Sequence, residues 1–293
     1  NKKYTANEND TTLVVNKNIT IDGNGAILDA DNLFRIMNIT DGITVTINNV
    51  TFLNGNSSTE GGAIRVFGEN GTVTILNSAF INTTARDWGG AIGGSGSSLR
   101  ISNSDFINTT AGTDGGAIEG WNVTVINSNF INNSAKGNGS SIYASALNAK
   151  DCVFNSPNAN GTAIIHIVST LDVNLTNNTI ESNLLAIYNA GGRLVSPTTL
   201  TFDNDTIKIG ESATLTGILT DDKGNIIGSN FNVTGKVNNT DLNFVFNEDT
   251  RKFTATYTPQ AIRDYTISGN YPRATNCTVT NGTLTVNKAT IEE

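Results

Sequence analysis

The chain has 293 residues, which is enough for one or two domains. Only 15% of the residues are charged and the formal net charge is −8, which argues against nucleic acid or anionic membranes as partners. No apolar run reaches the roughly 18 residues of a membrane-spanning helix, so we expect no membrane insertion here. Because the chain begins in a polar segment, residues 1–10, without a signal peptide, we expect a fragment of a larger secreted or anchored protein.

Two short motifs recur in step through the first 190 residues. The motif Asn-x-x-Phe-x-Asn occurs at residues 49–54, 77–82, 103–108 and 127–132. The motif Gly-Gly-Ala-Ile (GGAI) occurs at residues 61–64, 89–92 and 115–118, and related sequences follow at 139–142 and 161–164. Repetition at a period of roughly 22–28 residues indicates stacked units that bury one another's hydrophobic faces.

Aliphatic residues alternate between the motifs, as in strands with one buried face. One column contains Ile19, Val45, Val73, Leu99, Val123, Leu147 and Val173. A second column, two residues later, contains Ile21, Ile47, Ile75, Ile101, Val125, Ala149 and Leu175. The GGAI motifs supply a third column of Ile64, Ile92, Ile118, Ile142, Ile164 and Ile187. Three short strands per unit predict an all-β chain whose residues 1–195 form a right-handed parallel β-helix of about seven coils.

The recurring phenylalanines and asparagines are predicted to be structural ladders, because a catalytic group would not need to recur in every coil. One interior stack is expected to contain Phe52, Phe80, Phe106 and Phe130. An asparagine ladder at a turn, with its side chains buried and bonded to one another, is expected to contain Asn49, Asn77, Asn103 and Asn127. The paired glycines suit a turn that needs a positive φ or a close backbone approach.

The pattern changes after Gly191–Gly192, and Ser196–Pro197 marks a boundary. About seven short alternating strands with turns every 8–12 residues predict an Ig-like β-sandwich over residues 196–288. Asp264–Ile267 fits a tyrosine corner, in which Tyr265 would bond back to the backbone. Residues 289–293 would begin a linker, and further Ig-like modules of the same chain would be consistent with this ending.

The search for catalytic groups finds no convincing set. The only histidine, His166, has no adjacent Ser, Cys or acidic partner, so a structural or surface role is expected. No pair of carboxylates recurs on one strand face as glycoside hydrolysis requires, and Asp221–Asp222 is expected to lie in a solvated turn. Cys152 and Cys277 form no metal motif, so free thiols are expected, with an interdomain disulfide as the alternative. We therefore predict a protein without catalytic residues, metal or cofactor, although three or more carboxylates in a groove would favour an enzyme.

One group of residues stands out as a candidate binding patch. Aligning the coils on the GGAI motif stacks Glu60, Trp88 and Asp114, with Arg86 and Asp87 on the same turn ridge. Three residues past the second glycine lie Arg65 and Glu119, and Trp121 follows. Exposed aromatic residues flanked by polar groups are common on sugar- and protein-binding surfaces. The alternative is that both tryptophans only cover hydrophobic gaps.

The paired GGAI and Phe-x-Asn repeats resemble those of methanogen (archaeal) adhesin-like surface proteins, and more distantly those of chlamydial polymorphic outer-membrane proteins. The segment Ile19–Asp29 resembles the first coil of pectin-lyase-like β-helices, and Gly210–Asn225 resembles bacterial and archaeal Ig-like repeats. These resemblances imply a non-enzymatic extracellular adhesin that binds glycans or proteins of a partner-cell surface, with an Ig-like stalk. The 19 Asn-x-Ser/Thr sequons would permit glycosylation. The alternatives are a polysaccharide lyase or glycoside hydrolase of the same fold, and a structural subunit of an envelope or filament.

Overall fold

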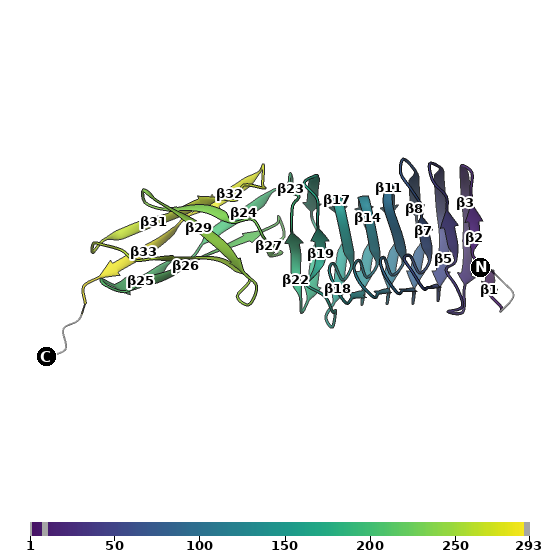
Figure 1. The fold of residues 1–293 in the computed structure, drawn as a ribbon, viewed down its shortest axis with the longest axis horizontal. Helices are drawn as coiled ribbons and strands as arrows, with labels where there is room; N and C mark the ends of the chain where they lie inside the picture. Colours follow the sequence, from purple (N-terminus) through teal and green to yellow (C-terminus); the bar gives the residue numbers. More distant parts are fainter. Residues whose placement is uncertain (1, 8–10, 290–293) are drawn as a thin grey trace.

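The computed structural model describes residues 2–7 and 11–289, and this part of the chain contains strands but no helix. The molecule is elongated: a regular stack of strands occupies the N-terminal part, and a second group of strands continues along the same axis (Figure 1). The prediction of an all-β chain with about seven coils of parallel stacked strands is confirmed. The predicted start of a linker falls mostly on residues 290–293, which lie outside the described residues.

Among the described residues, parallel pairing joins twenty strands into one continuous sheet that winds into coils. The set that we call the GGAI sheet contains β2 (Leu13–Val15), β4 (Met37–Ile39), β7 (Ile64–Val66), the beginnings of β11 (Ile92–Ser102), β14 (Ile118–Ile126) and β17 (Ile142–Lys150), and then β19 (Ala163–Ile167), β22 (Leu185–Asn189) and β27 (Ile227–Ser229). The next set contains β3 (Ile19–Asp29), β5 (Thr44–Leu53), β8 (Thr72–Leu76), β11 (Ile92–Ser102), β14 (Ile118–Ile126), β17 (Ile142–Lys150), β20 (Asp172–Thr176) and β23 (Arg193–Leu194).

The third set of stacked strands carries the phenylalanine motif. It contains the ends of β3 and β5, together with β1 (Lys3–Thr5), β9 (Ala79–Ile81), β12 (Asp105–Ile107), β15 (Asn129–Ile131), β18 (Val153–Ser156) and β21 (Thr179–Ser182). A separate sheet of very short strands closes the turns before the GGAI motifs, and it contains β6 (Asn56–Ser57), β10 (Thr84–Ala85), β13 (Thr110–Ala111) and β16 (Ser134–Ala135).

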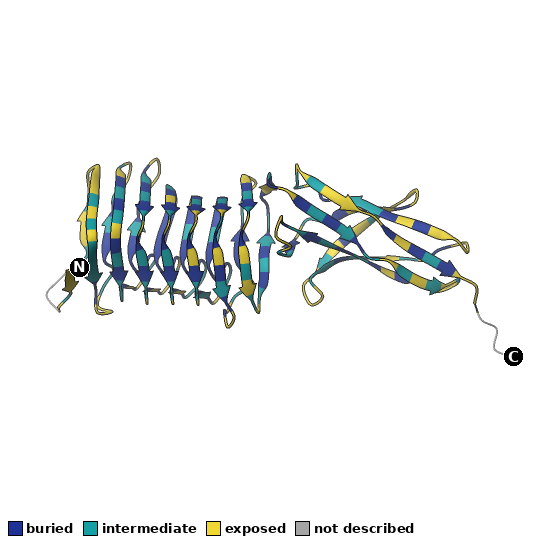
Figure 2. Cartoon of the chain, turned by 180° about the vertical axis from the view of Figure 1, so that it is seen from behind, coloured by how far each residue is buried: buried dark blue, intermediate teal, exposed yellow. Residues whose placement is uncertain are grey.

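From the second coil onward the predicted hydrophobic columns form the core of this stack, whereas in the first coil Ile19 is 39% exposed and Ile21 is only half-buried. Buried and exposed residues alternate along the strands (Figure 2). The first two columns pair in register from coil to coil. In the third column, however, Ile165 and not Ile164 lies opposite Ile142, because the turn before it is one residue longer than the motif suggested. The four predicted phenylalanines are fully buried, and with Phe154 they form one stack with ring centroids 4.6–4.9 Å apart.

The asparagine ladder is bonded as predicted from Asn77 to Asn127, but Asn77 donates to Asn48 Oδ1 and not to Asn49, and the prediction that the ladder is buried is wrong. Asn77, Asn103 and Asn127 are exposed. Asn127 donates from Nδ2 to Asn103 Oδ1 at 2.7 Å, and Asn103 donates to Asn77 Oδ1 at 3.4 Å. Each of these residues, like Asn49 in the same column, has φ between 48° and 56°. Asparagine tolerates this left-handed conformation better than most residues, so the column turns the chain at a corner.

The buried polar ladder lies one residue further along. Ser78, Ser104 and Ser128 are buried immediately after the exposed asparagines. The hydroxyl of Ser104 accepts the backbone N–H of Ser78, and the hydroxyl of Ser128 accepts that of Ser104, both at 3.2 Å. Each hydroxyl also donates to the carbonyl two residues earlier in its own coil. The Asn-Ser pair therefore combines an exposed turn residue with an internal bond to the next coil.

The two glycines of each GGAI motif have different roles. The first glycine has a positive φ, 61° at Gly61 and at Gly89. The second glycine allows close contact between coils, because a Cβ at Gly90 would lie 2.1 Å from the carbonyl oxygen of Gly116. Both reasons given for a glycine pair are therefore realised in one turn.

In the C-terminal region, the described part of the chain up to residue 289 contains nine paired strands in two groups that share β29. One group comprises β24 (Thr198–Phe202), β26 (Ala213–Thr220), β30 (Lys252–Tyr257) and β32 (Cys277–Thr280), and the other comprises β25 (Asp205–Lys208), β28 (Val233–Val237), β29 (Thr240–Asn247), β31 (Asp264–Asn270) and β33 (Gly282–Asn287). The Tyr265 hydroxyl donates to the Ala261 carbonyl and accepts its N–H, each at 3.1 Å, which is the bond expected of a tyrosine corner.

The two regions are joined by more than the chain between them. Strand β27 pairs in parallel with β22, although it lies beyond the predicted division at residue 195. Buried Tyr271 donates to Ser229 Oγ at 2.8 Å and accepts from Asn189 Nδ2 at 3.1 Å. In the turn at Asp221–Asp222, Asp222 is exposed as expected, whereas Asp221 is buried and its carboxylate accepts the backbone N–H groups of Lys223 and Asn225. The C-terminal region thus covers the last coil.

Candidate binding surface

An outward-facing column runs along the GGAI sheet, one residue after each buried isoleucine. Strand register places Gly93 between Arg65 and Glu119 in consecutive coils. The same register continues from Glu119 through Tyr143, His166 and Tyr188. We call these residues, Arg65 to Tyr188, the outer column. It brings Arg65 and Glu119 into one line, as the motif alignment predicted.

Glu60 reaches the outer column from the turn before β7. A Cβ built at Gly93 would lie 2.9 Å from Glu60 Cβ, so the glutamate side chain occupies the space that Gly93 leaves open. Its carboxylate forms an ion pair with Arg65 Nε, and the Arg65 guanidinium lies over the Phe67 ring at 3.7 Å from the centroid. Glycine at position 93 therefore decides where Glu60 lies, which the sequence did not reveal.

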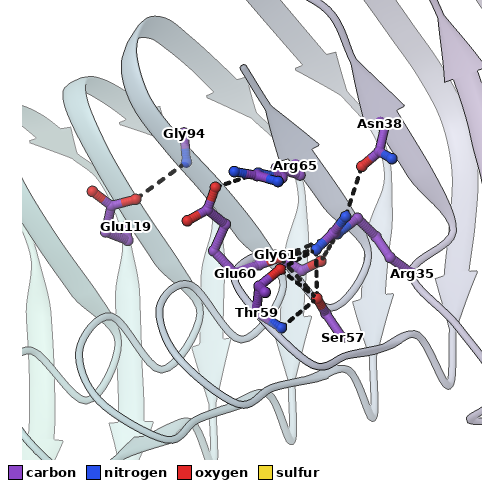
Figure 3. A network of polar contacts seen from close by, with 9 residues as sticks. All are labelled: Arg35, Asn38, Ser57, Thr59, Glu60, Gly61, Arg65, Gly94 and Glu119. Atoms are coloured by element: carbon purple, nitrogen blue, oxygen red, sulfur yellow. Dashed lines mark hydrogen bonds and ion pairs between the residues drawn. The ribbon is translucent and has the colours of Figure 1, made fainter. Parts of the chain in front are cut away.

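Arg35 holds the turn that carries Glu60 and was not identified from the sequence. Its guanidinium donates to the backbone carbonyls of Glu60 and Gly61 and to the side chains of Asn38, Ser57 and Thr59, at 2.6–3.1 Å (Figure 3). Burial lowers the pKa of this arginine. Since Met37 lies opposite Ile64, Arg35 occupies the position of the second GGAI glycine, and extending the alignment by one coil would have found it.

Glu119 lies in a largely dehydrated part of the outer column. Burial, with a smaller contribution from the nearby carboxylates of Glu60 and Asp114, raises its pKa to about 7, and a hydrogen bond from the Gly94 N–H opposes the shift. That N–H donates to Glu119 Oε2 at 3.3 Å (Figure 3). Two predicted site residues, Glu60 and Asp114, thus lie close enough to raise the pKa of a third, Glu119.

The second half of the outer column is aromatic. His166 is 8% exposed, and its ring lies between Tyr143 and Tyr188 with centroids 5.5 and 5.0 Å apart. Burial lowers the pKa of His166 to about 4, so the imidazole is neutral at pH 7. His166 is thus a buried, stacked residue, in agreement with the structural role expected, and its ring partners come from the adjacent coils. Tyr143 and Tyr188 each come one residue after an isoleucine of the third column, Ile142 and Ile187, just as Glu119 follows Ile118. This spacing in the sequence would have placed both tyrosines in the outer column.

The two tryptophans lie at different positions beside the outer column. Trp88 belongs to the turn column with Glu60 and Asp114, because Gly61 donates to the Trp88 carbonyl and Gly89 donates to the Asp114 carbonyl. Trp88 is 43% exposed and Trp121, on β14 two residues after Glu119, is 51% exposed. Trp121 borders a depression of about 620 Å³ with Glu69 and Asn70. Both tryptophan side chains are therefore accessible at the surface.

The remaining predicted site residues lie on the turn ridge. Arg86 is strongly exposed and pairs with its neighbour Asp87 at 3.2 Å between Nε and Oδ1. Arg86 borders a depression shared with Arg35 and Ser57. The structure therefore places Arg86 and Asp87 beside the surface, while Glu60, Arg65 and Glu119 form its centre.

Within residues 2–7 and 11–289, no three His, Cys, Asp or Glu side chains are placed to hold a metal ion. The described chain also has no helix that is long and apolar enough to cross a membrane. Comparison with protein-family models, with curated proteins and with solved structures finds no significant match to this chain.

Proposed function

We propose that this protein is a cell-surface adhesin that binds glycans or proteins of a partner-cell surface and performs no catalysis. The observation that carries the proposal is the outer column of polar and aromatic side chains beside two exposed tryptophans, Trp88 and Trp121. Half-exposed tryptophans are costly to hydrate and bind sugar rings and protein side chains well. A rigid stack of coils presents them at fixed spacing.

The charges beside this surface favour an uncharged glycan or a protein as the ligand. Arg65 is engaged by Glu60 and by the Phe67 ring, and Arg35 donates into its own turn. Arg86 pairs with Asp87. The cations that could attract an acidic glycan therefore already have partners, and a net charge of −8 disfavours anionic surfaces.

The C-terminal region would serve as an Ig-like stalk in this proposal. The hydrogen bonds of Tyr265 with Ala261 support the Ig-like interpretation. The region continues the long axis of the stacked coils, so it would hold the outer column away from an attachment point (Figure 1). An extracellular location and kinship with the methanogen adhesin-like proteins are parts of the same proposal and rest on the repeat motifs.

The test is binding to an array of neutral and acidic oligosaccharides by the wild-type chain and by a Trp88→Ala/Trp121→Ala variant. The matched control is Ile262→Ala, which removes an exposed apolar side chain from the C-terminal region. We expect binding to neutral glycans that the double variant loses and the control retains. Binding that is equal in all three proteins would remove this surface from the proposal.

One observation favours a second function, a glycoside hydrolase. Glu119 has a pKa of about 7, while the neighbouring Glu60 is paired with Arg65, and two carboxyl groups in such different environments are the usual acid and base of glycoside hydrolysis. The test is release of reducing ends from neutral and acidic polysaccharides. Activity that Glu119→Gln abolishes in a folded protein would establish the enzyme and overturn the adhesin proposal.

A further inference from the structure

A pocket of about 530 Å³ lies where the stacked coils meet the C-terminal region. One side comes from β19, β22 and the turns before them, including His166, Asn183 and Tyr188. The other side comes from the hairpin between β29 and β30, including Phe246, Glu248 and Arg251. The pocket is within the size range of small-molecule sites in proteins.

Contacts on both sides fix the pocket walls. Arg251 Nη2 donates to the Asn183 carbonyl at 2.6 Å, which joins the hairpin to the last coil. Phe246 packs so closely on the added strand β27 that a Cβ at Gly228 would lie 2.5 Å from its ring. In the pairing of β27 with β22, Gly228 lies opposite Tyr188, so the contact with Phe246 adjoins the part of the pocket wall that carries Tyr188. The pocket is therefore formed before any ligand enters it.

The lining offers both hydrogen-bond donors and acceptors but little net charge. Thr162 Oγ1 donates to Asn138 Oδ1 at 2.9 Å and lies 3.4 Å from His166 Nδ1. His166 is neutral at pH 7, so its ring presents one donor and one acceptor. Glu248 and Arg251 contribute one charge of each sign. Such a lining matches a ligand that has many hydroxyl groups and no charge.

The pocket continues the outer column, because His166 and Tyr188 belong to both. A chain-like ligand lying along that column would reach the pocket with its end. We propose that this pocket, which we call the junction pocket, binds the terminal one or two sugar residues of an uncharged glycan. This inference rests on the proposed glycan-binding function and adds a specific subsite to it.

The experiment titrates the full chain with glucose, galactose, mannose, N-acetylglucosamine and their β-linked disaccharides, and follows binding by saturation-transfer NMR and calorimetry. Galacturonic acid serves as the charged comparison. We expect one or more neutral sugars to bind, and we expect at least tenfold weaker binding in Tyr188→Ala and in Glu248→Gln. Asp241→Asn, which removes an exposed carboxylate elsewhere in the C-terminal region, is the matched control and should bind as wild type.

Two results would refute sugar binding in the junction pocket. One is that no sugar in the panel binds at millimolar concentration, and the other is that Glu248→Gln binds sugar as tightly as the wild type. Glu248 is exposed on a hairpin, so this variant remains informative if Tyr188→Ala does not fold. Failure of the pocket is separable from failure of the proposed function. A positive glycan array with a flat titration refutes only the pocket, whereas a negative array refutes glycan binding by the outer column.

Discussion

Truncation of Phe106 to alanine tests the packing that holds the coils together. Phe106 is fully buried, and its ring lies between Phe80 and Phe130 with centroids 4.8 Å away on each side. Removing a core phenylalanine costs about 3–5 kcal/mol through lost transfer energy and the remaining cavity. That total includes two aromatic contacts, each of about 0.5–1.5 kcal/mol. We expect the free energy of unfolding to fall by an amount in this range.

The assay is equilibrium unfolding in urea, followed by far-UV circular dichroism and by tryptophan fluorescence. Trp88 and Trp121 belong to the neighbouring coils, so their fluorescence reports on the region around position 106. The matched variant is Phe52→Ala, since Phe52 is also fully buried but has a ring neighbour on one side only. Phe52→Ala should lose less unfolding free energy than Phe106→Ala, and the difference should be about one aromatic contact, 0.5–1.5 kcal/mol. A loss below about 1 kcal/mol for Phe106→Ala would refute the continuous stack.

Three further predictions concern the turn, the buried carboxyl group and catalysis. Asn103→Leu should lower the free energy of unfolding by about 1–3 kcal/mol in urea, because leucine tolerates a φ of 50° poorly and breaks the ladder, and Asn103→Gly should cost less. Because the pKa of Glu119 is higher in the folded than in the unfolded chain, the free energy of unfolding of the wild type should fall by about 1–3 kcal/mol between pH 4.5 and 7.5 relative to that of Glu119→Gln. Parallel curves of unfolding free energy against pH for the two proteins would contradict this. We expect no unsaturated or reducing product from polygalacturonate, with or without Ca²⁺, and product that one Asp or Arg substitution abolishes would contradict the non-enzymatic account.

The sequence predicted the interior of the stack well because a strand alternates between two faces. Residues such as Val73 and Ile75 repeat that alternation in every coil, so their burial and register follow directly. At the corners the same reasoning fails. The alternation of a strand does not predict whether the side chain of Asn103 or that of Ser104 points into the core. The positive φ at Asn103 determines that Ser104 is the buried residue.

The candidate site could be predicted only as far as strand register reaches. The shared column of Arg65 and Glu119 follows from their distance to the GGAI motif. The position of Glu60 does not, because it depends on the missing side chain at Gly93 in another coil. The junction pocket was equally hidden, since it requires β27 to return to the last coil from about 40 residues further along the chain.

The most direct test of the central claim compares glycan-array binding by the wild type, Trp88→Ala/Trp121→Ala and Ile262→Ala, with each protein first shown to be folded by circular dichroism. The account predicts that the wild type and Ile262→Ala bind the same neutral glycans and that the double tryptophan variant binds at least tenfold more weakly. Binding of the same glycans by the double variant at wild-type strength would contradict the claim that the ligand lies on the outer column.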